Sequence, residues 1–243
     1  MTIKLHQFPA GAGVPNLSSF CMKVETWLRL AGLKYEVVNT PDPGKGPLGK
    51  LPFITDGDQQ VADSANIIEH LSRAYGKDLD AGLSPAQRAV SHAFTRMLAE
   101  HTYWGVVYTR WLRPEGWIKT RKIFFGGLPP GVRQLAAALV QRKMVRDMHG
   151  HGLGRHPEAE ILRRTEQDLA SVSAQLGSQE FMFGASPTTL DASVYAFLAS
   201  MWDARVDSPL KAVVGKYPNL VAYCARMRAR CFPELPKIKE LKN

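Results

Sequence analysis

The chain has 243 residues, of which 45% are hydrophobic and 22% are charged, and its formal net charge is +9. This composition is typical of a globular protein with one large or two smaller cores, and no run reaches the roughly 18 apolar residues of a membrane-spanning helix. The three cysteines, Cys21, Cys224 and Cys231, lack the spacing of a zinc site or a disulfide framework, so we expect no metal and no disulfide.

The charge is unevenly distributed along the chain. Residues 1–80 contain 8 Lys+Arg and 9 Asp+Glu, a net of −1, so the remainder, with 23 and 13, carries +10. A basic half of this kind can attract an anionic ligand, a membrane surface or nucleic acid. Because its basic residues are scattered along predicted helices, we expect a solvated basic surface and no nucleic-acid binding. With no secretory segment at the start, we expect a cytoplasmic protein without a membrane anchor.

The first eighty residues alternate between strand and helix patterns. Apolar residues at i, i+4, i+7, i+8 and i+11 from Phe20 predict a helix over 20–31, which Gly32 ends. The remaining predicted elements are strands at 3–8, 35–39, 51–55 and 59–62 and a helix at 65–75. This βαβ-ββα order is that of a thioredoxin-like domain.

Two features of this unit predict a binding site. A proline that follows Leu51 at the mouth of an apolar strand, Pro52, predicts a cis turn, which leaves the backbone of the preceding residue outside the sheet. Asp63 and Ser64 stand where the next helix starts, and free backbone N–H groups and a hydroxyl there can hold a carboxylate. Together they describe a site for a peptide backbone with an adjacent carboxylate, and glutathione is such a ligand.

The rest of the chain is predominantly helical in pattern. Residues 76–84 read as a linker, and Ser84-Pro85 predicts the start of a helix. The Gly/Pro-rich segment 113–133 predicts a long loop or a broken helix, which could cover the site or contact a partner. Thr188-x-x-Asp191 predicts a capping box with a structural role. We therefore expect domains at 1–77 and 85–243, joined by a linker at 78–84.

Four motifs in this order resemble the soluble glutathione transferase superfamily. They are Ser18-Ser19-Phe20-Cys21, Lys50-Leu51-Pro52-Phe53, Asp63-Ser64 and the Thr188…Asp191 cap. The similarity extends over nearly the whole chain. Three further segments look like its failed axon connections and metaxin-like branch: Phe20-Cys21-Met22-Lys23-Val24-Glu25-Thr26-Trp27-Leu28-Arg29, Gly152-Leu153-Gly154-Arg155-His156 and Pro187-Thr188-Thr189-Leu190-Asp191-Ala192.

The resemblance implies a fold and a ligand. The fold is a thioredoxin-like N-terminal domain followed by an all-helical C-terminal domain, commonly as a homodimer. Glutathione is bound between the domains as co-substrate. In the family the residue that activates the glutathione thiol lies at the start of the first helix, which implies Ser18. Ser19, where proline is more usual, is the next candidate, and Ser18 as a plain helix cap stays open.

Cys21 is a third candidate for the catalytic group, as the second cysteine of a thioredoxin-type pair whose first cysteine is absent. It is otherwise a buried small residue, and Cys224 and Cys231 are expected to be structural.

The resemblance also implies roles for the binding residues. Leu51 and Pro52 would pair with the cysteinyl backbone, and Asp63 and Ser64 would take the γ-glutamyl ammonium and carboxylate. Lys50 would face the glycyl carboxylate. The hydrophobic substrate would lie against aromatic residues of a C-terminal helix, which are otherwise a core stripe: Tyr103, Trp104, Tyr108 and Trp111.

The sequence thus predicts a detoxifying glutathione transferase that conjugates glutathione to small hydrophobic electrophiles, or uses it to reduce them. The main alternative is a non-catalytic glutathione-binding or protein-interaction module of metaxin type. A thiol oxidoreductase that uses Cys21 is disfavoured, because serine stands where such enzymes have their first cysteine.

Overall fold

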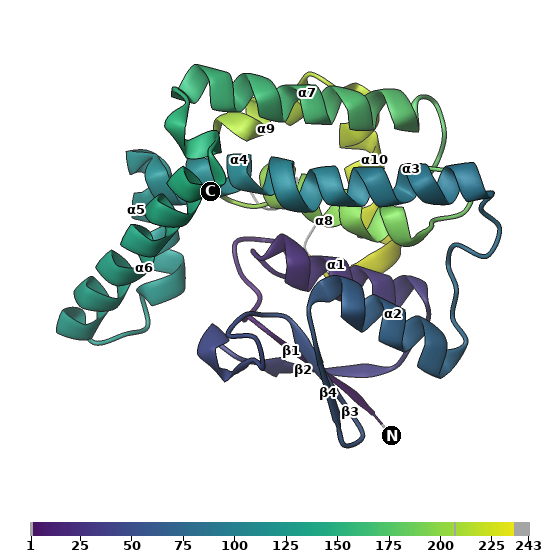
Figure 1. Cartoon of the computed structure of the whole chain (residues 1–243), viewed down its shortest axis with the longest axis horizontal. Coiled ribbons are helices and arrows are strands. Elements are labelled where there is room, and N and C mark those ends of the chain that lie inside the picture. Colours follow the sequence, from purple (N-terminus) through teal and green to yellow (C-terminus); the bar gives the residue numbers. More distant parts are fainter. Residues whose placement is uncertain (1, 207, 236–243) are drawn as a thin grey trace.

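The computed structural model describes residues 2–206 and 208–235, and it places a four-stranded sheet domain beneath a layer of helices (Figure 1). The strands are β1 (Ile3–Gln7), β2 (Tyr35–Asn39), β3 (Phe53–Asp56) and β4 (Gln59–Ala62), in the order β2-β1-β3-β4. β1 runs parallel to β2 and antiparallel to β3, and β3 is antiparallel to β4. This is the predicted thioredoxin-like arrangement.

Helices α1 (Ser19–Leu30) and α2 (Ser64–Tyr75) pack together on one face of this sheet. Their contact is built from the apolar stripe that the sequence shows. Val24, Trp27 and Leu28 of α1 are fully buried against Ile3, Leu5 and Ile54 of the strands and Ile67 and Leu71 of α2. The third strand starts two residues later than predicted, because the cis Leu51–Pro52 turn precedes it.

The second domain is helical. Its helices are α3 (Pro85–Arg96), α4 (Tyr103–Val107), α5 (Pro114–Phe125), α6 (Pro130–His151), α7 (Glu158–Leu176), α8 (Thr189–Trp202), α9 (Pro209–Gly215) and α10 (Pro218–Cys231). Two π-helical segments, Met97–Thr102 and Tyr108–Leu112, flank α4. Within residues 2–206 and 208–235, no helix is long and apolar enough to cross a membrane.

Segment 113–133, predicted as a long loop or a broken helix, is a broken helix: it contains α5 and the start of α6. Of its Gly/Pro run, residues 126–129 form the short turn between α5 and α6, and Pro130 and Gly131 are the first residues of α6. Pro114 and Pro130 each begin a helix, a position where the missing N–H of proline costs no hydrogen bond. The segment is therefore a helical hairpin.

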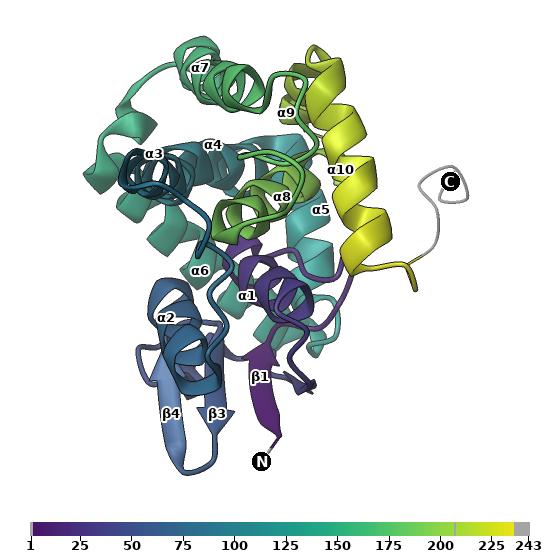
Figure 2. The same ribbon diagram turned by 90° about the vertical axis from the view of Figure 1, so that its right-hand side faces the viewer.

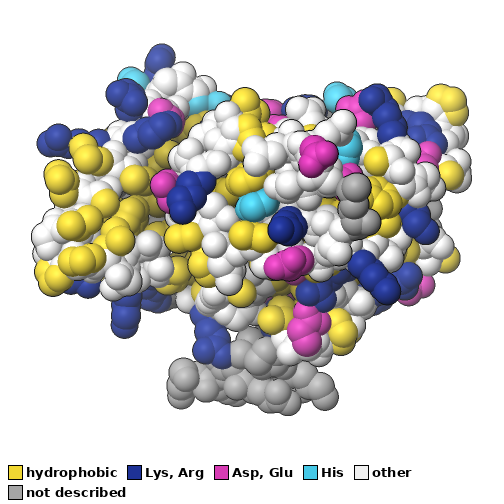
Figure 3. Space-filling model, turned by 90° about the horizontal axis from the view of Figure 1, so that it is seen from below, with side chains coloured by type: hydrophobic (Ala, Val, Ile, Leu, Met, Phe, Trp, Pro, Cys, Tyr) yellow, Lys and Arg dark blue, Asp and Glu magenta, His cyan; other side chains and the backbone are white. Residues whose placement is uncertain are grey.

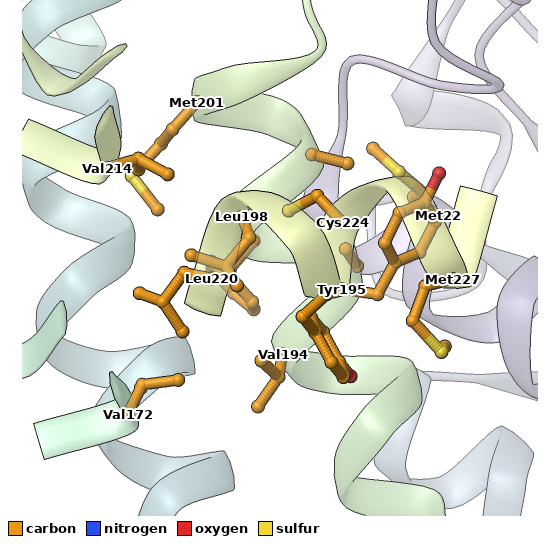
Figure 4. Close-up of a cluster of buried hydrophobic side chains, with 14 of the residues drawn as sticks. Met22, Val172, Val194, Tyr195, Leu198, Met201, Val214, Leu220, Cys224 and Met227 are labelled. Atoms are coloured by element: carbon orange, nitrogen blue, oxygen red, sulfur yellow. The ribbon is translucent and has the colours of Figure 1, made fainter. Parts of the chain in front are cut away.

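The centre of the helical domain is α8, which is buried along almost its whole length. Figure 4 shows Val194, Tyr195 and Leu198 of α8 surrounded by residues of its neighbours: Val172 of α7, Val214 of α9, and Leu220, Cys224 and Met227 of α10. Met22 of α1 joins the same cluster. A helix that is apolar on most sides is stable only when it is buried. One side of α8 packs against α1, and this contact joins the two domains (Figure 2).

The start of α8 has the predicted capping box. Asp191, with no exposed surface, accepts hydrogen bonds from the Thr188 backbone N–H (2.8 Å) and hydroxyl (2.9 Å). It also accepts from the Met182 N–H (3.0 Å) and the Tyr223 hydroxyl (3.0 Å). This carboxylate joins α8, α10 and the loop before α8, which is a structural role.

Candidate functional site

Three segments of the sheet domain converge at its junction with the helices: the start of α1, the turn before β3 and the start of α2. Cys21, in the first turn of α1, packs against Leu51 and Phe53. Two residues further on, Lys23 reaches the start of α2, where its Nζ donates to the Ser64 Oγ (3.4 Å). The residues predicted to contact the thiol of a ligand, at the start of α1, and those predicted to contact its carboxylate, at the start of α2, therefore lie around one junction.

The turn before β3 presents the backbone of Leu51. The Leu51–Pro52 peptide bond is cis, and the pairing of β1 with β3 begins only at His6 and Phe53. Leu51 thus lies beyond the end of this ladder, where its backbone can pair with an extended peptide. Lys50, the residue before it, is exposed.

The start of α2 has the character of an anion site. Asp63 caps the helix with a positive φ of 73° and accepts a hydrogen bond from the Ala65 N–H (2.8 Å), while its side chain is exposed. Ser64 is buried, with its hydroxyl at the positive end of the helix dipole. Free N–H groups and a hydroxyl at such an end are suited to a carboxylate.

Lys23 strengthens this site, and sequence reasoning did not find it. Its side chain is only 5% exposed, and within the described part of the chain it makes no ion pair. Burial lowers the pKa of Lys23 to about 8, an effect that Asp63 opposes and Arg96 reinforces. A buried ammonium whose partner is a hydroxyl is better satisfied when an anion joins it. In the sequence Lys23 shares its helix turn with the charged Glu25, so no local pattern marks it as buried.

Ser18 stands at the start of α1. Its Oγ accepts a hydrogen bond from the Cys21 N–H (3.3 Å), so it caps the helix. Asn16, fully buried, fixes the approach to it: the Asn16 Oδ1 accepts from the Ser18 N–H (2.9 Å) and its Nδ2 donates to the Phe8 carbonyl (2.6 Å). The cap uses an oxygen lone pair of Ser18, and its hydroxyl proton, which hydrogen-bonds the Cys21 thiol here, could turn to donate to a ligand.

Arg110 is a second residue that the sequence did not indicate. This buried guanidinium, from the π-helical segment after α4, donates to the Leu17 carbonyl (2.7 Å) and to the Ser200 carbonyl of α8 (2.7 Å). Burial lowers its pKa to about 10, so it stays charged near neutral pH. It ties the loop that carries Ser18 to the core of the helical domain.

The other two candidates for the catalytic group are buried. Ser19, the first residue of α1, is 3% exposed. Cys21 has no exposed surface, and burial raises the pKa of its thiol to about 12 although the Ser18 hydrogen bond lowers it. This environment favours the neutral thiol. Cys224 and Cys231 are also buried, and in the ranges that the structure describes no group of His, Cys, Asp and Glu could hold a metal ion.

The four aromatic residues predicted for the hydrophobic pocket pack on one small core and differ in their further contacts. The Tyr103 ring lies 5.1 Å from that of Phe20 in α1. Trp111 lies 5.7 Å from Phe124 of α5, which in turn contacts Phe8 at the end of β1. Tyr103 therefore contacts the first turn of α1 directly, and Trp111 is linked through Phe124 to the end of β1.

Trp104 and Tyr108 face another way. The Trp104 ring stacks on His151 of α6 (4.7 Å), and the Tyr108 hydroxyl donates to Glu158 of α7 (3.0 Å). Both pack on a small core formed mainly by α4, α6 and α7, on which Tyr103 and Trp111 also pack. Of the four, Tyr103 and Trp111 also make ring contacts toward the sheet domain, Tyr103 with Phe20 and Trp111 through Phe124, which the sequence did not single out.

Comparisons with known proteins assign the class. The model of the glutathione S-transferase N-terminal domain matches residues 19–116, and that of the C-terminal domain matches residues 165–227. The isoprene-epoxide–glutathione S-transferase of Rhodococcus sp. (strain AD45) is 31% identical over 93% of this chain and 98% of its own length. The chain belongs to the glutathione S-transferase family.

Within the family, the chain is similar to Failed axon connections of Drosophila melanogaster, with 37% identity over 97% of this chain. It spans 59% of the length of that protein, and it is also 29% identical to human metaxin-1 over 95% of this chain and 51% of metaxin-1. Among solved structures, a Methylobacterium radiotolerans glutathione S-transferase in complex with glutathione sulfonate has the same fold (TM-score 0.64, 19% identity, 97% of this chain and 94% of that one).

Proposed function

We propose that this protein is a glutathione transferase that binds glutathione at the junction of α1, β3 and α2 and transfers it to small hydrophobic electrophiles. The observation that carries the proposal is the Lys23 ammonium, buried against Ser64 at the start of α2, which makes no ion pair within the described part of the chain although the Asp63 carboxylate is near enough to act on its pKa. The γ-glutamyl carboxylate of glutathione supplies the missing charge. Membership of the glutathione S-transferase family supports the choice of ligand.

The remaining parts of glutathione have partners in the same region. The backbone of Leu51, beyond the end of the β1–β3 ladder, would pair with the cysteinyl unit next to Pro52. The exposed Asp63 carboxylate would accept from the γ-glutamyl ammonium, and the exposed Lys50 would face the glycyl carboxylate. In this orientation the cysteinyl sulfur points toward the start of α1.

Ser18 would then act as the catalytic residue. Its hydroxyl proton donates a hydrogen bond to the sulfur and, with the α1 dipole, favours the thiolate over the thiol. Hydrogen bonds to charged groups contribute about 1.5 to 3 kcal/mol, which lowers a thiol pKa by about one to two units. The thiolate attacks the electrophile, an S–C bond forms, and the departing group or opened epoxide oxygen takes up a proton.

The hydrophobic electrophile would lie on the aromatic side of the junction. Tyr103 and Trp111, with Phe124, are the residues of this side that contact elements leading to Ser18. Trp104 and Tyr108 would support this wall through the small core behind it. We also propose that the protein is a homodimer, which sedimentation velocity tests, and that it is located in the cytoplasm.

Calorimetric titration with glutathione tests the proposal. We expect Ser64→Ala to weaken binding about tenfold and Ser18→Ala to leave it nearly unchanged. The thiolate absorbance of bound glutathione should be present in the wild type and absent in Ser18→Ala. Epoxides are the first electrophiles to assay, because one relative is named for such a substrate. An absence of binding at millimolar glutathione would overturn the proposal.

The second candidate function is a non-catalytic glutathione-binding or protein-interaction module. The observation that favours it is the 37% identity to Failed axon connections, which exceeds the 31% identity to the named transferase. The same titration separates the two candidates. A module would bind glutathione in a Ser64-dependent manner, with no thiolate absorbance and no turnover of any electrophile.

A further inference from the structure

The exposed apolar side chains of this protein are concentrated on the α5–α6 hairpin. Among the residues that the structure describes, nine large hydrophobic side chains are exposed, and seven of them lie on α5, on α6 or in the turn between them. The seven are Ile118, Ile123, Leu128, Val132, Leu135, Leu139 and Val145. The other two, Val37 and Leu48, belong to the sheet domain. An apolar patch of this kind marks an interaction surface.

The hairpin is shaped to reach such a surface. It extends from one end of the helical layer, away from α3 and α7 (Figure 1). Figure 3 shows hydrophobic side chains gathered at this end of the molecule. On α6, Val132, Leu135 and Leu139 share one face at i, i+3 and i+7, with exposed fractions of 56%, 64% and 57%. The same spacing continues into Arg142 and Arg146, nearer the body of the protein.

The hairpin is also strongly basic. Residues 114–151 contain seven Lys+Arg and two Asp+Glu, a net of +5 within a chain whose total is +9. A depression of about 380 Å³ at the hairpin is lined by Ile118, Arg121, Lys122, Gly126, Arg133 and Gln134. Within residues 2–206 and 208–235, its three cationic side chains form no ion pair. The depression can therefore receive an anionic group.

We propose that the α5–α6 hairpin docks this protein on the surface of an anionic lipid bilayer. The seven exposed apolar side chains of the hairpin enter the interface between headgroups and acyl chains. The basic side chains of the hairpin, including those that line the depression, bind the phosphate-bearing headgroups. This goes beyond the proposed transferase activity and does not depend on it.

The charge and the apolar residues together select this occupant. A second copy of the hairpin would bring two segments of net +5 together, which opposes pairing on this face. Nucleic acid would satisfy the charge but leave the seven apolar side chains in water. An anionic bilayer offers negative headgroups to the basic side chains and an apolar interior to the exposed hydrophobic ones. The predicted homodimer would then use a different surface.

Flotation with vesicles tests the proposal. The wild-type chain should float with phosphatidylcholine vesicles that contain about 30% phosphatidylserine and much less with phosphatidylcholine alone. The double variant Leu135→Ser/Leu139→Ser should lose the association. Arg142→Gln and Arg146→Gln should each weaken it about fivefold. The matched control is Leu48→Ser, which removes a side chain of equal exposure (66% against 64% for Leu135) and should change nothing.

A site-specific label provides an independent readout. All three native cysteines are buried, so an environment-sensitive fluorophore can be attached selectively at Leu139→Cys or, as control, at Leu48→Cys. We expect anionic vesicles to shift the emission of the first label to the blue and not that of the second. Circular dichroism of each variant shows that it is folded.

Three outcomes would overturn the proposal. The first is no association with anionic vesicles, and the second is association that the hairpin variants do not reduce. The third is a Leu139→Cys label that shifts with protein concentration, with a DNA fragment or with an acidic polypeptide but not with vesicles, which would assign the face to a second copy, a nucleic acid or a protein partner.

Discussion

Two helix starts in this protein use similar residues in different ways. α8 and α2 each have an aspartate at the start that accepts hydrogen bonds: Asp191, in the first turn of α8, accepts from the N-cap Thr188, and Asp63 is itself the N-cap of α2 and accepts from Ala65. At α8, Asp191 is fully buried and all its hydrogen bonds come from this chain. At α2, Asp63 is exposed with a hydrogen bond to Ala65, and a buried Lys23 faces Ser64.

The difference lies in how completely the chain satisfies its own polar groups. The α8 start is closed, and its carboxylate serves folding. The α2 start combines an exposed carboxylate with a buried cation that makes no ion pair in the described part of the chain, and such a cation costs stability unless a ligand supplies the partner charge. Residue type therefore does not separate a cap from a binding site, but the arrangement of partners does.

The largest effect is expected at the closed start. Asp191→Ala removes the acceptor for the backbone N–H groups of Met182 and Thr188 and for the Thr188 hydroxyl, while the Tyr223 hydroxyl keeps the backbone carbonyl of residue 191. Each unsatisfied group costs about 1 to 3 kcal/mol, so we expect a total loss of roughly 3 to 5 kcal/mol in the free energy of unfolding, after partial relaxation. Urea unfolding measures it. Asp63→Ala is the matched control at the open start and should cost about 1 kcal/mol. Equal losses would contradict the comparison.

The second prediction concerns the buried cation. Lys23→Met keeps the volume of the side chain but removes its charge, and we expect binding of glutathione to weaken at least about tenfold. Because the lysine is buried without an ion pair in the described part of the chain, we also expect the free energy of unfolding to rise by about 1 kcal/mol. Calorimetry and urea unfolding measure the two quantities on one preparation. A variant that is both destabilised and able to bind would show that Lys23 serves folding alone.

Local signals explain why most of the fold could be predicted. The stripe on α1, the Ser84-Pro85 start and the Thr188…Asp191 box are all encoded within a few residues, and the structure confirms each of them. The turn at Leu51–Pro52 is likewise local. Segment 113–133 was harder, because proline and glycine also occur at the ends of helices, as they do in this hairpin.

The missed site residues depend on contacts between distant parts of the chain. Lys23 meets Ser64 across 41 positions, and Arg110 meets Leu17 across 93. No local pattern distinguishes either from a solvated surface cation, which is the usual state of lysine and arginine. Only the packing of α1 against α2, and of the helical domain against the loop before α1, buries them.

The third prediction uses the pKa of Lys23. In the folded protein it is about 8, below the ordinary value of 10.5, so the ammonium is present below pH 8 and is lost as the pH rises through that value. Binding of S-methylglutathione, which has no thiol to titrate, should weaken severalfold between pH 7 and about pH 9. The ratio of wild-type to Lys23→Gln affinities cancels the titration of the ligand itself. A ratio that stays constant would remove Lys23 from the site.

The same pKa has a consequence for stability. Between about pH 8 and pH 10.5 the unfolded chain binds more protons at this lysine than the folded chain does, so its contribution makes the protein more stable as the pH rises. Lys23→Gln should remove this part of the slope.

The smallest effect is expected at Cys21, and it decides between two chemistries. Its thiol is buried and its pKa is raised to about 12, so almost none is thiolate near neutral pH. Cys21→Ala should therefore leave glutathione binding and any turnover within about twofold, while the small cavity costs about 1 kcal/mol of stability. Iodoacetamide should leave Cys21 unmodified in the native protein. Loss of turnover without loss of binding would instead identify a redox thiol at the start of α1, and Ser18 would be left as a helix cap.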